Sequence, residues 1–196
     1  LVIAAAMLAI MLVWWKGSEI LLAKTRRTEL PLVELMPMLE RSRVAVVPGT
    51  GVYLTANADN TPTALLHTMK HFKVMHERIV VLTVITSSWP YLEMEEGVSI
   101  EHLSDRITRL RVVTGFMQQA NIPAVLDYCR ERGLPNESMS TSFMLSRREV
   151  KAERPSALPL PATALFIVLA HNAADATDYF GVPKDRVVEI GMQVGL

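Results

Sequence analysis

The chain opens with an uncharged apolar run, LVIAAAMLAIMLVWW, over residues 1–15. As an α-helix this run would be about 22 Å long, which is short of the ~30 Å hydrocarbon core of a bilayer. It begins without a methionine and ends in Trp14 and Trp15, a residue type enriched at membrane interfaces. We therefore predict the end of a last transmembrane helix. A buried core helix is the alternative, whereas a signal peptide would need a basic stretch before the run and a small-residue cleavage site after it.

Residues 16–42 mix charged residues with leucines and contain Pro31 and Pro37. The basic side chains of Lys16 and Lys24 favour the cytoplasmic side under the positive-inside rule. We expect the prolines to divide the segment into short helical pieces. It is predicted to be a juxtamembrane connector, which either transmits position between membrane and domain or is a simple linker.

From residue 43 the pattern becomes that of an α/β domain. A valine-rich run at residues 44–47 predicts a strand, the PGTG sequence at 48–51 predicts a turn, and residues 52–55 predict a second strand. A polar loop follows at 57–61.

The next two elements are a helix and a buried strand. Pro62 occupies a first helical position, with Thr61 as its N-cap. The helix is indicated by apolar residues at helical spacing, namely Leu65, Leu66, Met69, Phe72 and Met75. Residues 79–85 then form a nearly continuous apolar run, which favours a strand buried on both faces.

The second half continues the alternation of strands and helices. Its expected elements are an antiparallel pair of strands at 98–100 and 107–114, a helix at 122–130, a strand at 139–145, a proline-rich loop at 151–161, a helix at 162–179 that docks on the sheet, and a strand at 188–194. This order predicts a mixed β-sheet covered by helices, that is, an α/β layer fold over residues 43–196.

Composition narrows the function classes. Lys plus Arg and Asp plus Glu number 20 each, so the formal net charge is zero and general nucleic-acid binding is not expected. A single cysteine, Cys129, excludes an internal disulfide and a site with several thiolate ligands. Hydrophobic residues make up 50% of the chain and the mean hydropathy is +0.24, which is high for a soluble domain.

Three histidines lie close together in the sequence. His67 and His71 are spaced i, i+4, so on one helix face they could bind a divalent ion. No Glu follows His67 as it would in a zincin motif, and His76 is expected at the helix end. We favour hydrogen bonding within the domain or at a dimer contact over a metal site, and their pKa range also permits pH sensing.

Two features of the sequence are candidate phosphate contacts. The glycines of the PGTG sequence could let backbone N–H groups approach an anion, but no Walker lysine or G-x-G-x-x-G spacing accompanies them. Arg109 and Arg147 could bind phosphate or simply be solvated. No G-x-S-x-G motif or other catalytic set is present, so we do not expect an enzyme.

Four segments carry a family resemblance: VPGTGVYLT at 47–55, P-x-A-L-L-H at 62–67, K-H-x-K-V-x-H-E at 70–77 and V-x-L-T-V at 80–84. Together they closely resemble the cytoplasmic C-terminal domain of the Kup/HAK/KT family of potassium uptake proteins. The resemblance implies a universal-stress-like α/β module that follows the last helix of a multi-pass inner-membrane part, with residues 43–196 on the cytoplasmic side. In that family the membrane part carries potassium together with protons.

The resemblance also implies partners and a role. We expect a regulatory or assembly function within a potassium:proton symporter, contact with the rest of its membrane domain and with lipid, a homodimer formed through the cytoplasmic domain, and a possible cyclic dinucleotide regulator. The alternative is a nucleotide-binding regulatory module tethered to the membrane. The residues expected at a regulatory ligand or dimer contact are Gly49, Thr50, Gly51, His67, His71, Arg109 and Arg147. No catalytic, metal or potassium-binding residue is predicted.

Overall fold

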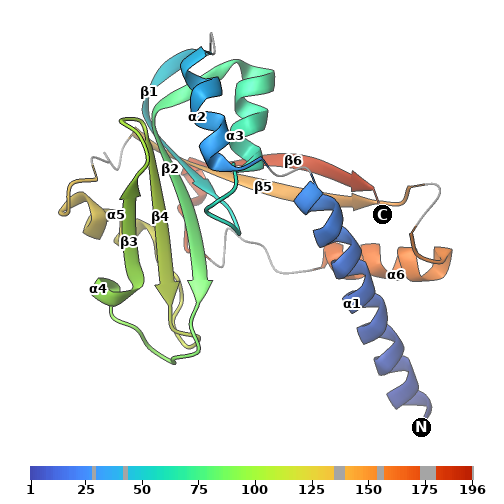
Figure 1. Cartoon of the computed structure of the whole chain (residues 1–196). Coiled ribbons are helices and arrows are strands. Elements are labelled where there is room, and N and C mark those ends of the chain that lie inside the picture. The colour runs from blue at the N-terminus through green and yellow to red at the C-terminus, as the bar shows by residue number, and fades with distance from the viewer. Residues whose placement is uncertain (28–29, 42–43, 135–139, 154–156, 173–179, 196) are drawn as a thin grey trace. The chain divides into compact units, whose positions relative to one another are not determined.

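The fold was derived from a computed structural model, which describes residues 1–27, 30–41, 44–134, 140–153, 157–172 and 180–195. It contains six strands: β1 Ala45–Leu54, β2 Val74–Thr86, β3 Val98–His102, β4 Ile107–Thr114, β5 Thr141–Lys151 and β6 Val187–Gly195. The helices are α1 Val2–Arg27, α2 Leu32–Arg41, α3 Thr63–His67, the π-helix η1 Thr68–Phe72, α4 Met94–Gly97, α5 Ile122–Arg130, α6 Leu160–His171 and the 3₁₀-helix η3 Lys184–Arg186 (Figure 1).

The strands form one mixed sheet in the order β3-β4-β2-β1-β5-β6. β1 pairs in parallel with β2 and with β5, β2 pairs in parallel with β4, and β3 pairs antiparallel with β4 at the edge. The predicted mixed α/β fold and the predicted antiparallel pair are therefore confirmed. The finer expectation of a universal-stress-like arrangement stays a prediction.

The chain divides into two compact units, which are described separately. The larger one comprises residues 30–146 and 175–190, and the smaller one comprises residues 1–29, 147–174 and 191–196.

Alternating side chains of the central strands build a core on each face of the sheet in the larger unit. On one face, Val52, Leu82 and Leu110 pack with Ile122 and Leu126 of α5. On the other face the core consists of Leu32 and Leu35 of α2, Ala64 and Leu65 of α3, and Tyr53, Met75, Ile79, Val81, Ile107 and Met144. Helices thus cover both faces, as a sheet of buried parallel strands requires.

α2 differs from the expectation of helix-breaking prolines. Pro31 precedes the helix, but Pro37 lies inside it. Leu32 and Leu35 are 0% and 2% exposed, so their burial offsets the backbone hydrogen bond that a proline inside a helix removes.

The PGTG sequence is not a turn between two strands. Residues 45–54 form one strand, and the pairing register with β2 shifts between Val47 and Thr50. The extra residue of this β-bulge is accommodated by Gly49, whose φ of 104° lies in the region that favours glycine. Pairing with strands on both sides therefore overrides the local turn signal.

The helix that was predicted from Pro62 to Met75 is shorter. α3 ends at His67, η1 ends at Phe72, and Lys73 adopts the left-handed conformation, so Met75 already belongs to β2. Thr61 is not the N-cap, since Pro62 occupies that position without a side-chain capping bond. The buried residues 79–83 confirm the predicted strand, although β2 begins earlier.

In the smaller unit, α1 continues well beyond residue 15. Its segment Val2–Thr25 has a mean hydropathy of 1.5, and it is the one helix in the described parts of the chain that is long and apolar enough to cross a membrane. At 24 residues this segment reaches about 36 Å, so the helix does not end at residue 15. That residues 1–15 are the end of a transmembrane helix stays a prediction.

α6 packs against α1 in the same unit (Figure 1), a contact that was not predicted from the sequence. Its predicted docking on the sheet stays a prediction. The part of the predicted helix at 173–179 lies outside the described residues. β5 extends to Lys151, beyond the predicted strand end at residue 145, so Lys151 is the last strand residue and not the first residue of the predicted loop.

Candidate functional site

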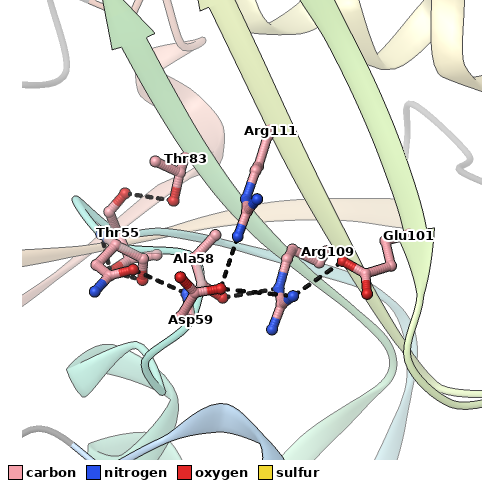
Figure 2. A network of polar contacts seen from close by, with 8 residues as sticks. Thr55, Ala58, Asp59, Thr83, Glu101, Arg109 and Arg111 are labelled. Carbon is pink, nitrogen blue, oxygen red and sulfur yellow. Dashed lines mark hydrogen bonds and ion pairs between the residues drawn. The ribbon is translucent and has the colours of Figure 1, made fainter.

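Four charged side chains form a polar network beside the carboxyl end of β1 (Figure 2). Arg109 Nη1 donates to Glu101 Oε2 at 2.9 Å and lies 3.6 Å from Asp59 Oδ1. Arg111 Nη2 donates to the same Asp59 oxygen at 2.7 Å. Two guanidinium groups and two carboxylates thus neutralise one another. We call Asp59, Glu101, Arg109 and Arg111 the polar network.

Strand geometry places the two arginines together. Arg109 and Arg111 are spaced i, i+2 on β4, so both point to the face that carries Ile107, while Leu110 points to the opposite core. Glu101 is the register partner of Arg109 in the antiparallel β3–β4 pair. The side chain of Arg109 is only 11% exposed, whereas that of Asp59 is 62% exposed.

The loop after β1 is fastened to the sheet by further bonds. Arg109 Nε donates to the carbonyl oxygen of Ala58 at 3.0 Å, and Thr83 Oγ1 donates to the carbonyl oxygen of Thr55 at 3.0 Å (Figure 2). Asn57 Oδ1 accepts from the N–H of Asp59 at 3.0 Å, which closes a local turn. The polar network and these bonds together form a clamp that joins β1, β2, β3 and β4.

The location of the clamp bears on the ligand hypothesis. In open α/β sheets, ligands bind beyond the carboxyl ends of parallel strands, close to the point where the strand order reverses. Here β1 stands between β2 and β5, which makes it such a point. Arg109 lies on β4, two strands away from β1, and reaches only the loop after β1. Its guanidinium already bonds a carboxylate and a carbonyl, so its chemistry in this arrangement is structural.

The packing of the sheet explains why positions 49 and 51 of the PGTG sequence are glycines. A Cβ on Gly49 would lie 2.6 Å from the carbonyl oxygen of Ser140, and one on Gly51 would lie 2.6 Å from Nδ1 of His76. Gly51 also pairs with Ile79 on one side and with Ser142 on the other. These glycines are required by the close approach of neighbouring strands and of the His76 ring. The Thr50 hydroxyl is buried and finds no hydrogen-bond partner among the residues that the structure describes.

The histidines separate into a pair and a single residue. The rings of His67 and His71 stack, with their centroids 5.4 Å apart, on α3 and η1. His76 lies in β2 and not at a helix end, and its Nδ1 is 3.4 Å from the hydroxyl oxygen of Tyr53. Among the residues that the structure describes, no three His, Cys, Asp or Glu side chains gather as a metal site would require.

Burial controls the protonation of the Tyr53–His76 pair. Burial raises the pKa of Tyr53 to about 12, against a smaller lowering by a hydrogen bond with Thr68. Burial also lowers the pKa of His76 from its ordinary value of 6.5. Both side chains are therefore neutral near pH 7, and the tyrosine hydroxyl can donate to the unprotonated Nδ1 of the imidazole.

Arg147, the last of the predicted site residues, lies apart from the others. It belongs to β5 within the smaller unit, whereas the other predicted site residues belong to the larger unit.

The larger unit contains a small cavity of about 50 Å³. Asp127, Phe143 and Pro183 are among the residues that line it. Pockets for small-molecule ligands usually measure about 300–1,000 Å³, so this cavity is too small for a nucleotide.

Residues 48–196 match the K+ potassium transporter C-terminal domain family. The chain belongs to this family. It is 44% identical over 194 residues to the probable potassium transport system protein Kup of Brucella anthropi and 46% identical over 194 residues to Kup 1 of Bradyrhizobium diazoefficiens. It is also 46% identical over 192 residues to Kup of Caulobacter vibrioides. These alignments cover 98–99% of the chain but only 29–30% of each relative. No solved structure matches the chain.

In this K+ potassium transporter C-terminal domain, sequence reasoning found Arg109 but missed its acidic partners. Glu101 could have been found, because two antiparallel strands joined by a short connection bring opposite charges face to face. Asp59 could not, since it is 50 positions from Arg109 in the chain and reaches it only through the parallel β1–β2–β4 arrangement.

Proposed function

We propose that the chain is the C-terminal part of a potassium uptake transporter that couples potassium to protons. The observation that carries this proposal is the family match over residues 48–196, together with relatives named as potassium transport system proteins along nearly the whole chain. The chain spans about 30% of the length of these relatives. We therefore assign the transport path to the remainder of the transporter and an accessory role to this part.

The location that we propose rests on α1. The uncharged first part of α1, up to Trp15, would form the end of a multi-pass inner-membrane domain. Lys16 and Lys24, which follow it in the same helix, favour a cytoplasmic position for the residues beyond α1. The α/β domain would then face the cytoplasm.

Within the transporter, we assign the domain a role in assembly or regulation. The clamp built around the neutralised polar network joins four strands, and Arg109 is bonded within the domain, which suits a rigid scaffold better than a catalytic centre. A homodimer through this domain and a cyclic dinucleotide regulator remain predictions. The alternative of a nucleotide-binding module is not favoured by a specific observation, because Arg109 already bonds Glu101 and the PGTG sequence is part of a central strand.

The test is potassium-limited growth of a bacterium that lacks its own uptake systems. The complete gene is expected to restore growth, and a gene truncated before residue 43 shows whether the domain is needed. If truncation abolishes growth and the protein is also lost from the membrane, the role is assembly. If the truncated protein remains in the membrane and its potassium uptake is altered, the role is regulation. No rescue by a well-expressed complete gene would overturn the transporter proposal.

The coupling ion is tested separately. Uptake of potassium into vesicles that contain the complete transporter is expected to rise with an inward proton gradient. Uptake that is indifferent to the gradient would contradict symport while leaving potassium transport intact.

A further inference from the structure

We propose that α6 is a second membrane-contacting element. It would lie beside α1 at the membrane interface, with its exposed side in contact with the hydrocarbon core. The proposal rests on the proposed function in one respect, namely that α1 crosses a membrane. It goes beyond that function because it assigns a lipid surface to a helix about 130 positions further along the chain.

The sequence of α6, LPATALFIVLAH, contains no charged residue before His171 at its end. Leu160, Ala164 and Val168 follow one another at intervals of four and form its exposed stripe, and Leu160 and Val168 are 67% and 58% exposed. A helix on the surface of a water-soluble domain carries polar residues on such a stripe. The exposed side of α6 is therefore suited to an apolar solvent.

The inward side of α6 packs on α1. Phe166 is 1% exposed, and its ring centroid lies 5.6 Å from that of Trp14. Gly17 is buried beneath the same ring, and any side chain there would collide with Phe166. The two helices thus approach closely where α1 has a glycine, as helices in membranes commonly do.

The contact lies at a definite level of α1. Trp14 belongs to the last part of the uncharged run, and Lys16 is the first charged residue. Farther along α1, Lys24 donates to Glu153 at 3.2 Å and to the carbonyl oxygen of Gly195 at 2.9 Å. The ion pair of Lys16 with Glu19, at 3.2 Å, begins the charged part of α1 at this contact, and Lys24 follows about two turns later. α6 therefore packs where the apolar part of α1 gives way to its charged part, which is the polarity profile of a membrane interface.

Length decides between spanning and partial insertion. Twelve residues give α6 a length of about 18 Å, which is too short to cross a ~30 Å core. Apolar helices of this size are buried core helices or interfacial segments. The exposure of Leu160 and Val168 argues against a core position within this chain, so we assign lipid as the covering surface.

The test compares two exposed valines in the complete transporter. Val168→Cys on α6 and Val188→Cys on β6, where the valine is 44% exposed, are each labelled with a polarity-sensitive fluorophore. The labelled proteins are reconstituted in vesicles of phosphatidylcholine and phosphatidylglycerol that carry a quencher on the acyl chains. The unsubstituted protein, in which Cys129 is buried, is the blank for labelling of this chain.

We expect the probe at position 168 to emit at shorter wavelength and to be quenched several-fold more strongly than the probe at position 188. Equal, weak quenching at both positions would overturn the proposal. A blue-shifted probe at 168 that the lipid quencher does not reach would also overturn it, because protein would then cover α6. Leu160→Cys provides a second position on the same stripe if Val168→Cys does not assemble.

Potassium uptake by the same vesicles separates the two proposals. Uptake without lipid quenching at position 168 would refute the role of α6 and leave the proposed function standing. Quenching at 168 in vesicles that take up no potassium would support lipid contact by α6 and contradict the transporter assignment.

Discussion

Arg109 and Glu101 face each other across the antiparallel β3–β4 pair, and Arg109 Nη1 donates to Glu101 Oε2 at 2.9 Å. The same guanidinium reaches the loop after β1 through the Ala58 carbonyl oxygen and Asp59. One side chain therefore ties the edge strand of the sheet to the carboxyl end of its central strand. From the sequence, the charge of Arg109 was a candidate contact for a ligand, but in the structure it stabilises the fold.

Replacing Arg109 with methionine is expected to destabilise the domain by about 2 kcal/mol, because the largely buried arginine makes several charge-assisted bonds. Arg111→Met is the matched control on the same strand face. Its ion pair with Asp59 is more exposed and is expected to contribute less than about 1 kcal/mol. Thermal unfolding of the detergent-solubilised chain measures both variants. Equal effects of the two substitutions would contradict the clamp.

Gly51→Ala is expected to destabilise the domain by about 1–3 kcal/mol, because the added Cβ would overlap the ring of His76. Gly191→Ala is the control, since no atom of the described residues lies within 4 Å of a Cβ at that position of β6. The melting temperature should fall for Gly51→Ala and change little for Gly191→Ala. If the His76 ring is the obstacle, Gly51→Ala should cost less in a His76→Ala background than in the natural chain.

Acidification is expected to destabilise the domain through His76. Because its folded pKa lies below its ordinary value of 6.5, only the unfolded chain binds the proton just below that pH. Stability should therefore be complete above about pH 6.5, fall as the pH is lowered toward the folded pKa of His76, and level off below it. Melting curves of the natural chain and of His76→Gln, recorded at a series of pH values from about 6.5 downward, measure how much of the loss of stability depends on His76. The exposed His71→Gln variant is the control for loss of one histidine, and an identical slope in natural and His76→Gln chains would refute the assignment.

Cys129 is expected to resist thiol reagents in the folded chain. Its side chain is fully buried, and burial raises the pKa of its thiol to about 11 despite the nearby positive charge of Arg132. The thiolate that would react is therefore scarce at pH 8. Modification monitored by absorbance should be slow in buffer and rapid in concentrated urea. Fast, complete modification of the folded chain would show that α5 opens readily.

Local sequence patterns were sufficient to predict those elements whose surroundings in the fold favour the same secondary structure as their own sequence. The continuous apolar run of β2, the mixed pattern of β4 and the helix α5 with Pro123 in its first turn were all predicted. In these segments the alternation or the helical spacing of apolar residues reflects the faces that become buried. The uncharged start of α1 was likewise visible, although the helix continues to Arg27.

β1 and α6 show where local patterns fail. Pro48 and Gly49 are typical of a turn when only their sequence neighbours are considered, but pairing with β2 and β5 keeps the backbone extended around a bulge. The apolar sequence of α6 indicates burial without identifying the surface that buries it, and the packing of Phe166 on Trp14 shows that α1 is one such surface.

The sequence by itself determined the alternation of helices and strands, the membrane-compatible N-terminus and the family, because these depend on the order of residue types along the chain. Tertiary structure alone decided that Asp59 meets Arg109 and Arg111, that Gly51 lies under His76, and that α6 packs on α1. The physical reason is that these contacts join residues distant in the chain, and the register of the parallel strands and the packing of helices set their positions.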